Sequence, residues 1–192
     1  MMTTILMTLA LLAGTPEVDN TPRATTTVIF VNCAEENNGV LTATGRDQAS
    51  LLVRFLENED IKAIYAPYRS CLVATVQPLA RSKGQEVAYF YDASATDEAG
   101  MRHILSVMMA KNEGKTIVVC APGTSIEKMA GMLGIKKKSM KPNTGLFGEV
   151  LIVNVLYKGE AVAQKLNMNF QKKCNIWLRE CEICIPAIHA FS

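Results

Sequence analysis

Short apolar runs alternate along the chain with longer segments in which apolar residues recur every three or four positions. The first run, residues 27–31 (TVIFV), is β-branched and aromatic, which predicts a buried strand. Ala49, Leu52, Val53 and Leu56 follow at the i, i+3, i+4 and i+7 spacing of one helical face. The alternation then repeats, with strands predicted at 63–65, 87–91 and 116–119 and helical stripes at 72–80 and 101–109.

Three local signals complete this pattern. Residues 124–127 (TSIE) form a capping box, which predicts that a fourth helix begins there. Residues 150–157 and 161–167 flank Lys158-Gly159 as the strands of a hairpin would, and Asn37-Asn38-Gly39 is a turn signal. Strands that alternate with helices predict an α/β fold, a three-layer sandwich around a mainly parallel sheet. Ligands bind such sheets beyond the carboxyl ends of the strands, so we expect a functional site at the loops near Asn32, Ala66 and Cys120.

Composition adds a domain plan. Of the 192 residues 49% are apolar, which suffices for one core, and we expect a single domain over 26–168 with a separate tail over 169–192. With 20 basic and 18 acidic side chains the net charge is +2, so nothing indicates a nucleic-acid partner. The local basic cluster consists of Lys136, Lys137, Lys138 and Lys141. It is typical of a solvated loop, with an anion site as the alternative.

The first twenty residues resemble a secretory signal peptide. The apolar run at residues 5–13 is too short to span a bilayer, and small residues (Ala13, Gly14) and then polar ones follow it. We therefore expect export, to a periplasm or outside the cell, although no Lys or Arg precedes Arg23. A buried N-terminal segment in a cytoplasmic protein is the alternative. No other stretch is long and apolar enough to anchor the mature chain.

Several sequence blocks resemble those of a known family. Residues 41–49 (LTATGRDQA) are similar to its L-T-x-x-G-x-x-Q-A segment, and residues 63–65 with 75–80 to its block A-I-Y … T-A-x-P-L-A. Residues 115–125 (KTIVVCAPGTS) resemble its strand and loop K-T-V-L-V-V-G-H-x-x-T. Their order and spacing agree from about Thr26 to Leu166. On these blocks the chain resembles the histidine phosphatase superfamily, the phosphoglycerate mutase-like proteins.

The resemblance also implies which residues would do chemistry. In that family a histidine attacks phosphorus, two arginines and a second histidine surround the phosphoryl oxygens, and a carboxylic acid protonates the leaving group. The corresponding positions here are Asn32 for the first arginine, Cys33 for the nucleophile, Cys71 for the second arginine and Ala121 for the second histidine. Arg69 is two residues away from the second arginine position. Both histidines of the chain lie elsewhere, His103 off its helical stripe and His189 in the tail.

We therefore expect a non-catalytic relative that binds an unidentified small molecule or protein, with no cofactor. A phosphate-ester hydrolase with a rearranged pocket is an alternative. Glu35, Glu36, Asp92 and Asp97 lie near the expected rim, where one could have been the general acid. As isolated carboxylates they are more typical of loop solvation and, for Asp97, of a helix cap.

The six cysteines suggest a third possibility, a thiol or metal module. The resemblance places Cys33, Cys71 and Cys120 around one pocket, where thiols could form a disulfide, a redox pair or a soft-metal site. The alternative is that small cysteines fill space left by larger polar groups. A thiolate phosphatase would need an arginine in a C-x5-R loop, which none of the three has. The full set of pocket candidates is Asn32, Cys33, Arg69, Cys71, Cys120 and Ala121.

The tail carries a separate pattern, C-x6-C-x2-C-x4-H. Its members, Cys174, Cys181, Cys184 and His189, are candidate zinc ligands of low specificity. We expect no metal site elsewhere.

Overall fold

The computed structural model describes residues 25–91, 97–136, 148–156 and 160–168. Within them one sheet has six strands in the order β5-β4-β6-β1-β7-β8. The strands are β1 (Thr26–Val31), β4 (Ile61–Pro67), β5 (Val87–Phe90), β6 (Thr116–Cys120), β7 (Glu149–Val155) and β8 (Ala161–Asn167). Neighbours among β5, β4, β6 and β1 are parallel, whereas β7 and β8 are antiparallel additions. The expected mainly parallel sheet is confirmed.

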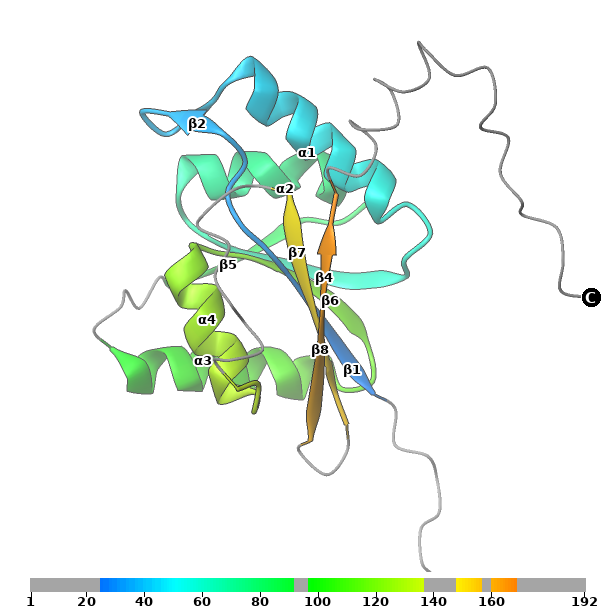
Figure 1. Ribbon diagram of the computed structural model, residues 1–192, viewed down its shortest axis with the longest axis vertical. Coiled ribbons are helices and arrows are strands. Elements are labelled where there is room, and N and C mark those ends of the chain that lie inside the picture. The colour runs from blue at the N-terminus through cyan, green and yellow to red at the C-terminus, as the bar shows by residue number, and fades with distance from the viewer. Residues whose placement is uncertain (1–24, 92–96, 137–147, 157–159, 169–192) are drawn as a thin grey trace, which may run out of the picture.

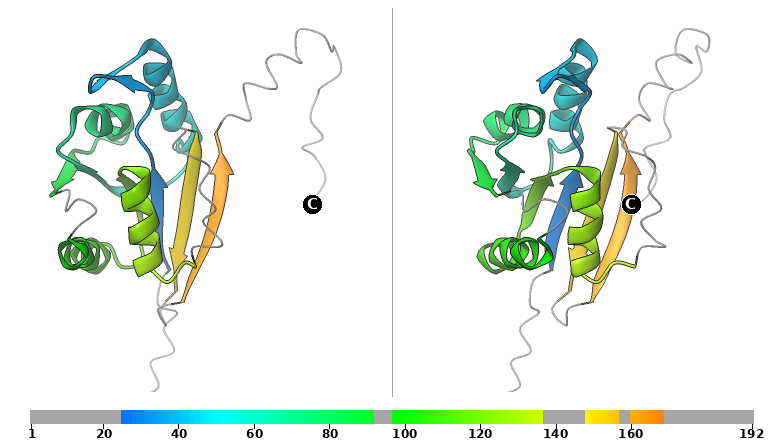
Figure 2. Two further views of the ribbon diagram at one scale, coloured as in Figure 1. Left: turned by 60° about the vertical axis from the view of Figure 1, so that its left-hand side comes forward. Right: turned by 90° about the vertical axis from the view of Figure 1, so that its left-hand side faces the viewer.

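Helices cover both faces of this sheet. They are α1 (Ala43–Phe55), α2 (Ser70–Ser82), α3 (Glu98–Lys111) and α4 (Gly123–Met132). Figures 1 and 2 show α1 and α2 together on one side of the sheet and α3 and α4 on the other. The three-layer sandwich expected from the alternation of strands and helices is therefore present.

Strand alternation divides the core into two halves. Ile29 and Val31 of β1 pack with α1 and α2, whereas Val28 and Phe30 pack with α3 and α4. Successive residues of a strand point to opposite faces, so an apolar run such as 27–31 serves both halves at once. The helices meet the sheet through the stripes that their spacing predicts. Their buried members include Ala49, Leu52, Leu72, Val76 and Leu79 in one half, and Met101, Leu105, Met108 and Met129 in the other.

The turn at Asn38 and Gly39 is present as the sequence predicts. It joins the short strands β2 (Glu36–Asn37) and β3 (Val40–Leu41), which pair antiparallel. Asn38 has φ 52° and Gly39 has φ 80°. Two consecutive left-handed residues are characteristic of a two-residue hairpin turn. The predicted hairpin near residue 158 is also present as the pair β7–β8, although Lys158 and Gly159 lie outside the described residues.

The predicted capping box at 124–127 is wrong. Helix α4 begins one residue earlier, at Gly123, with Pro122 as its N-cap residue and no side-chain cap. The backbone N–H groups of Ser125 and Ile126 both donate to the Pro122 carbonyl oxygen, at 2.9 and 3.0 Å. Only Ala121 and Pro122 separate β6 from α4, so the helix begins before Thr124 can occupy the cap position.

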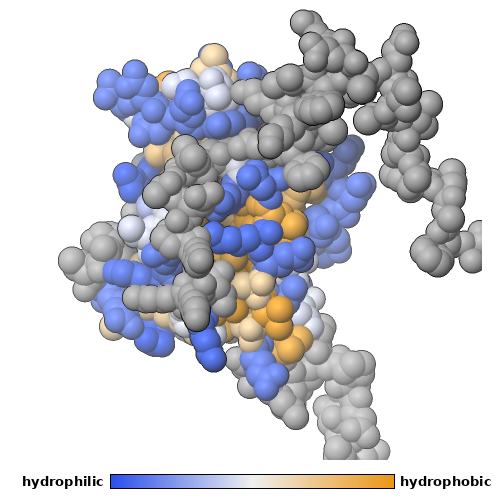
Figure 3. All heavy atoms as spheres, viewed as in Figure 1, coloured by the Kyte–Doolittle hydropathy of each residue, from blue (hydrophilic) through white to orange (hydrophobic). Residues whose placement is uncertain are grey.

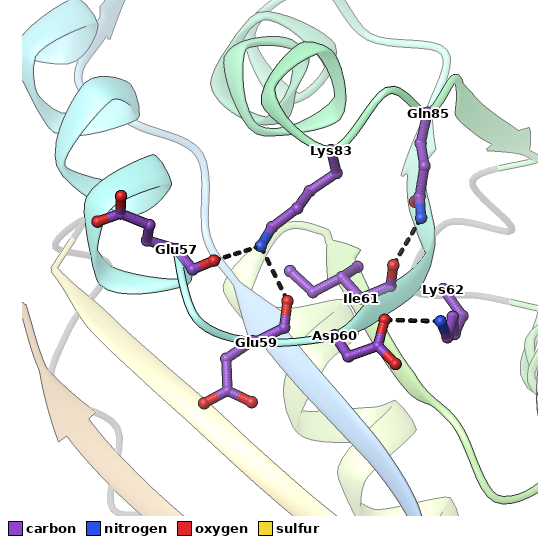
Figure 4. A network of polar contacts seen from close by, with 7 residues as sticks. All are labelled: Glu57, Glu59, Asp60, Ile61, Lys62, Lys83 and Gln85. Carbon is purple, nitrogen blue, oxygen red and sulfur yellow. Dashed lines mark hydrogen bonds and ion pairs between the residues drawn. The ribbon is translucent and has the colours of Figure 1, made fainter.

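Residues just after α2 form hydrogen bonds with the turn between α1 and β4 (Figure 4). The Lys83 ammonium donates to the carbonyl oxygens of Glu57 and Glu59, at 2.7 and 2.9 Å, and the Gln85 side-chain amide donates to that of Ile61. Asp60 and Lys62 add an exposed ion pair of 2.6 Å. These contacts lie at the sheet edge opposite to the carboxyl ends of β1, β4 and β6.

Apolar side chains also gather over β7 and β8 on the face shown in Figure 3. Val162 is 60% exposed there. A hollow of about 290 Å³ lies between these strands and the end of α1, with Phe55, Ile152 and Leu166 in its lining. Among the described residues, no helix is long and apolar enough to cross a membrane. The signal-like segment, Asp92, the lysines at 137, 138 and 141, and the whole tail lie outside the described residues.

Candidate functional site

Three neighbouring strands end at one edge of the sheet. Strands β4, β6 and β1 are adjacent and parallel, with Val31 opposite Cys120 and Tyr65 opposite Val119. Their carboxyl ends therefore lie together. The loop after β1 carries Asn32 and Cys33, the start of α2 carries Arg69 and Cys71, and the end of β6 carries Cys120 and Ala121. The topology thus brings all six predicted pocket residues to the same edge.

The loop after β1 is held by the first turns of α1, with Glu35 as the point of attachment. The Thr42 N–H donates to the Glu35 carbonyl oxygen at 3.1 Å, and the Thr42 hydroxyl donates to the Glu35 carboxylate at 2.6 Å. The Glu35 N–H donates to the Gln48 side-chain oxygen at 2.7 Å. Thr42 also caps α1 by accepting from the Gly45 N–H at 3.0 Å.

Gly45 completes this arrangement because α1 passes directly over the loop. A methyl group placed on Gly45 would overlap the Glu35 carbonyl oxygen. Only glycine permits so close a backbone approach. Thr42, Gly45 and Gln48 are three of the five specified residues of the L-T-x-x-G-x-x-Q-A block. Together they hold the loop after β1 and so position Cys33. We refer to these three residues as the Glu35 clamp.

Cys33, Cys71 and Cys120 all belong to the core half under α1 and α2. Cys120 is fully buried within it, and Cys33 and Cys71 are half-buried against it. The Cys33 and Cys71 side chains interact with each other, and this interaction raises the pKa of Cys33. All three are free thiols in this structure.

Thr75 contacts both half-buried cysteines. Its side chain is fully buried, and its hydroxyl oxygen lies 2.7 Å from the Cys71 carbonyl oxygen, to which it donates. The same oxygen lies 3.9 Å from Cys33 Sγ and accepts from the Ala34 N–H at 3.0 Å. In the sequence, Thr75 stands out only as one position of the family pattern. Its polar side chain within an apolar stripe of α2 was the signal that could have identified this contact.

The environment of the thiols disfavours their ionised form. Burial, followed by the hydrogen bond to Cys71 and the negative charge that Cys71 would carry as a thiolate, raises the pKa of Cys33 to about 12. The Thr75 hydroxyl lowers this pKa, and the Glu36 carboxylate raises it further. Burial also raises the pKa of Cys120, as do the charges of the other two cysteines.

The remaining predicted positions have different surroundings. The Asn32 side-chain oxygen accepts from the Cys33 N–H at 2.8 Å, so this amide is engaged with its own loop. Ala121 is fully buried and belongs to the core half under α3 and α4, on the other face from the cysteines. Its N–H donates to the Val31 carbonyl oxygen at 3.0 Å, which extends the pairing of β1 and β6. Arg69 is exposed at the N-cap of α2.

The carboxylates at the rim have structural partners. Glu35 is held by the Glu35 clamp, and the Glu36 carboxylate accepts from the Gly39 N–H at 2.6 Å. Asp97 caps α3 by accepting from the Gly100 N–H at 2.9 Å, as its position predicts. His103 lies exposed on α3, as expected. Within the described ranges, no three His, Cys, Asp or Glu side chains are grouped so that they could hold a metal ion.

No family model matches the sequence, and no curated protein does. Solved structures do match. The chain is similar to phosphoglycerate mutase from Bacillus anthracis, with TM-score 0.62 and 11% identity over 80% of this chain and 98% of that one. It is also similar to phosphoserine phosphatase from Entamoeba histolytica, with TM-score 0.57 and 17% identity over 74% and 96%. A third match is phosphoglycerate mutase from Plasmodium falciparum, with TM-score 0.57 and 14% identity over 88% and 99%.

Proposed function

We propose that this chain, which has the fold of the histidine phosphatases, no longer transfers phosphoryl groups and instead binds a small molecule or another protein. The observation that carries the proposal is the identity of four residues at the strand ends. Asn32, Cys33, Cys71 and Ala121 occupy the positions that the resemblance assigns to two arginines and two histidines.

Phosphoryl transfer requires a nucleophile and positive charge around the phosphoryl oxygens. The Asn32 amide and the Ala121 methyl group supply no charge. Ala121 is fully buried on the opposite face of the sheet, so the side chain at this position does not reach the cysteines. Neither of these residues can stabilise a developing negative charge as an arginine or a histidinium ion would.

Cys33 is a poor substitute for the nucleophilic histidine. A thiol attacks as its thiolate, and the pKa of Cys33, raised to about 12, leaves almost no thiolate at neutral pH. The groups that lower a cysteine pKa in enzymes are cations and helix N-termini directed at the sulfur. Among the described residues, the Thr75 hydroxyl acts in this direction, and burial outweighs it.

The test is hydrolysis of p-nitrophenyl phosphate by the purified full chain. We expect no turnover above that of the Cys33→Ser variant, while an active phosphatase of the same fold, assayed in parallel, turns the substrate over. A variant with Asn32→Arg, Cys33→His and Cys71→Arg tests whether restoring the two arginines and the nucleophilic histidine is sufficient for hydrolysis. Turnover by the unaltered protein that Cys33→Ser abolishes would instead establish a hydrolase with a rearranged pocket.

The contact of both Cys33 and Cys71 with the Thr75 hydroxyl favours a second candidate function, thiol chemistry at the strand ends. This candidate does not require that a phosphate ester ever enters the site. A functional metal is less favoured, because the three thiols do not form a metal-holding group in the described part of the chain. The candidate zinc ligands of the tail stay a prediction.

We also propose that the protein is exported. The apolar run at residues 5–13, followed by Ala13, Gly14 and polar residues, supports this. N-terminal sequencing of the chain recovered from a native host tests it. We expect a mature N-terminus within the first twenty or so residues. An intact N-terminus on a protein found in the cytoplasm would contradict export.

A further inference from the structure

Two of the three cysteines at the strand ends are linked in a way that the third is not. Cys33 and Cys71 both contact the Thr75 hydroxyl, Cys33 with its sulfur at 3.9 Å and Cys71 with its carbonyl oxygen at 2.7 Å. Their side chains also interact with each other, whereas Cys120 is fully buried in the core. The pair therefore joins two segments, the loop after β1 and the first turn of α2, at one buried point.

We propose that Cys33 and Cys71 are an oxidation site that reacts with low-molecular-weight disulfides to form a disulfide bond across these two segments. The proposal goes beyond the loss of phosphoryl transfer and does not depend on it. Cys33 and Cys71 are both partly exposed to solvent, whereas Cys120 is fully buried, so we expect a small reagent to react with the first two. Oxidised glutathione represents this class of reagent and serves as the probe.

The reaction proceeds by two thiol–disulfide exchanges. The Cys71 thiolate attacks one sulfur of the reagent, its S–S bond breaks, and one thiolate leaves. The Cys33 thiolate then attacks the Cys71 sulfur of this mixed disulfide, and the second thiolate leaves. The two protein thiols are oxidised and lose two protons, the reagent disulfide is reduced to two thiols, and these take up the two protons.

The order of attack follows from the surroundings of Cys33. Its raised pKa makes it a slow first nucleophile at neutral pH, so the first step is assigned to Cys71. Once Cys71 carries the mixed disulfide, it can no longer ionise, and the charge that disfavours a Cys33 thiolate is gone. Burial still raises the pKa of Cys33, and the Thr75 hydroxyl near Cys33 Sγ only partly offsets it, so the second exchange is the slower of the two.

The same surroundings favour persistence of the product. A thiol of high pKa is a poor leaving group, so attack that would expel Cys33 from the disulfide is slow. The bond would close a loop of roughly 40 residues, which restricts the unfolded chain. We therefore expect a stable cross-link rather than a rapidly cycling redox catalyst. Its effect is to fix the loop after β1 to α2, where the Glu35 clamp already holds it to α1.

The experiment is a peptide map of the full chain. Reduced protein is incubated folded with oxidised glutathione at pH 8, quenched in acid, alkylated and digested with trypsin. Cleavage after arginine and lysine places Cys33 in peptide 24–46, Cys71 in peptide 70–81 and Cys120 in peptide 116–128, each with one cysteine. We expect the disulfide-linked pair of 24–46 and 70–81 to dominate, with Cys120 alkylated only after denaturation.

Four controls test whether the result is specific to the fold and to these two cysteines. The same treatment in concentrated urea should scatter the disulfides among all the cysteines. Cys120→Ala should leave the cross-link in place, and so should a chain in which Cys174, Cys181 and Cys184 are all serine. Cys33→Ser should leave a persistent mixed disulfide on Cys71, because the second nucleophile is missing.

A thermal melt gives an independent readout. Oxidation of the unaltered chain should raise its Tm by about 8 °C, and reduction should reverse the gain. Free Cys33 and Cys71 after prolonged incubation with the reagent, or a dominant bond from either to another cysteine, would overturn the proposal. Neither result would bear on whether the protein hydrolyses phosphate esters.

Discussion

The Glu35 clamp and the strand ends next to it differ in how well they match the family pattern that the sequence resembles. Thr42, Gly45 and Gln48 match the pattern that the sequence resembles, and each contacts Glu35 of the loop after β1. At the strand ends, Asn32, Cys33, Cys71 and Ala121 match none of the charged or nucleophilic groups that the same resemblance implies. The clamp contains only neutral groups and works through hydrogen bonds and close packing. It therefore holds the loop whether or not the chemistry of the strand ends is retained.

The two regions contribute to the domain in different ways. The clamp holds the loop after β1 through hydrogen bonds and close packing, whereas Cys120 and Ala121 at the end of β6 belong to the apolar core. Variants that weaken one region and spare the other test the contrast.

The largest effect is expected from Gly45→Ala. The new methyl group would overlap the Glu35 carbonyl oxygen, so α1 must move from the loop, at a cost of about 3 kcal/mol. Gly131→Ala is the matched control. Gly131 also lies in a helix, α4, and a methyl group there would contact nothing within 4 Å. Urea unfolding should show Gly131→Ala as neutral or stabilising by up to about 1 kcal/mol. Equal stability of the two variants would contradict the clamp.

Thr75→Val should rank second. The change leaves the buried Ala34 N–H without its acceptor and removes the link between Cys33 and Cys71, at a cost of about 2 kcal/mol in the free energy of unfolding. Thr75→Ser keeps the hydroxyl and should cost less. If equilibrium unfolding placed the serine variant below the valine variant, packing of the methyl group rather than the hydrogen bonds would explain the role of Thr75.

Removal of the cap at the start of α1 should cost less again. Thr42→Ala deletes the acceptor of the Gly45 N–H and the bond to Glu35, for about 1 kcal/mol. Thr44→Ala, two residues further on at an exposed helical position, should change stability by less than about 0.5 kcal/mol. Chemical denaturation of the two variants side by side measures the difference. A larger loss in Thr44→Ala would show that the cap is not what holds this turn.

The smallest effect concerns Cys33 and pH. Its folded pKa of about 12 lies above the ordinary value of 9.0, so the folded state holds the proton more tightly than the unfolded chain. The stability that this supplies is fully present below pH 9 and is lost as the pH rises from about 9 towards 12. Under reducing conditions, the unaltered chain should lose slightly more stability than Cys33→Ala between pH 8 and pH 9. A parallel loss in the two proteins would show that Cys33 titrates normally.

Much of the frame could be predicted from the sequence because its signals are periodic. The β-branched run at 27–31 predicts a buried strand. The apolar stripes at 49–56 and 72–80 predict helices, and a sheet is the surface on which such stripes can be buried. The start of α4 was misjudged because TSIE satisfies a capping pattern. The pattern carries no information on the length of the turn between β6 and α4, and this short turn determines that α4 begins at Gly123.

The site was predictable only as a set of positions. The resemblance placed six residues at one edge, but it could not show that Cys120 and Ala121, adjacent in sequence, serve opposite core halves. That follows from strand alternation, which the register of β6 in the sheet determines. The contacts of Thr75 and Gln48 depend on how α1 and α2 approach the loop after β1. No local sequence pattern encodes that approach.

The most direct test of the central claim is the affinity of the strand ends for orthophosphate, measured by calorimetric titration of the reduced full chain at neutral pH. It needs no knowledge of a substrate, and it reports directly on the positive charge that phosphoryl transfer requires. Without arginine and histidine at positions 32, 33, 71 and 121, we predict a Kd weaker than about 1 mM. A Kd well below that value, lost in an Asn32→Ala or Arg69→Ala variant, would contradict the account and show that a phosphate site persists.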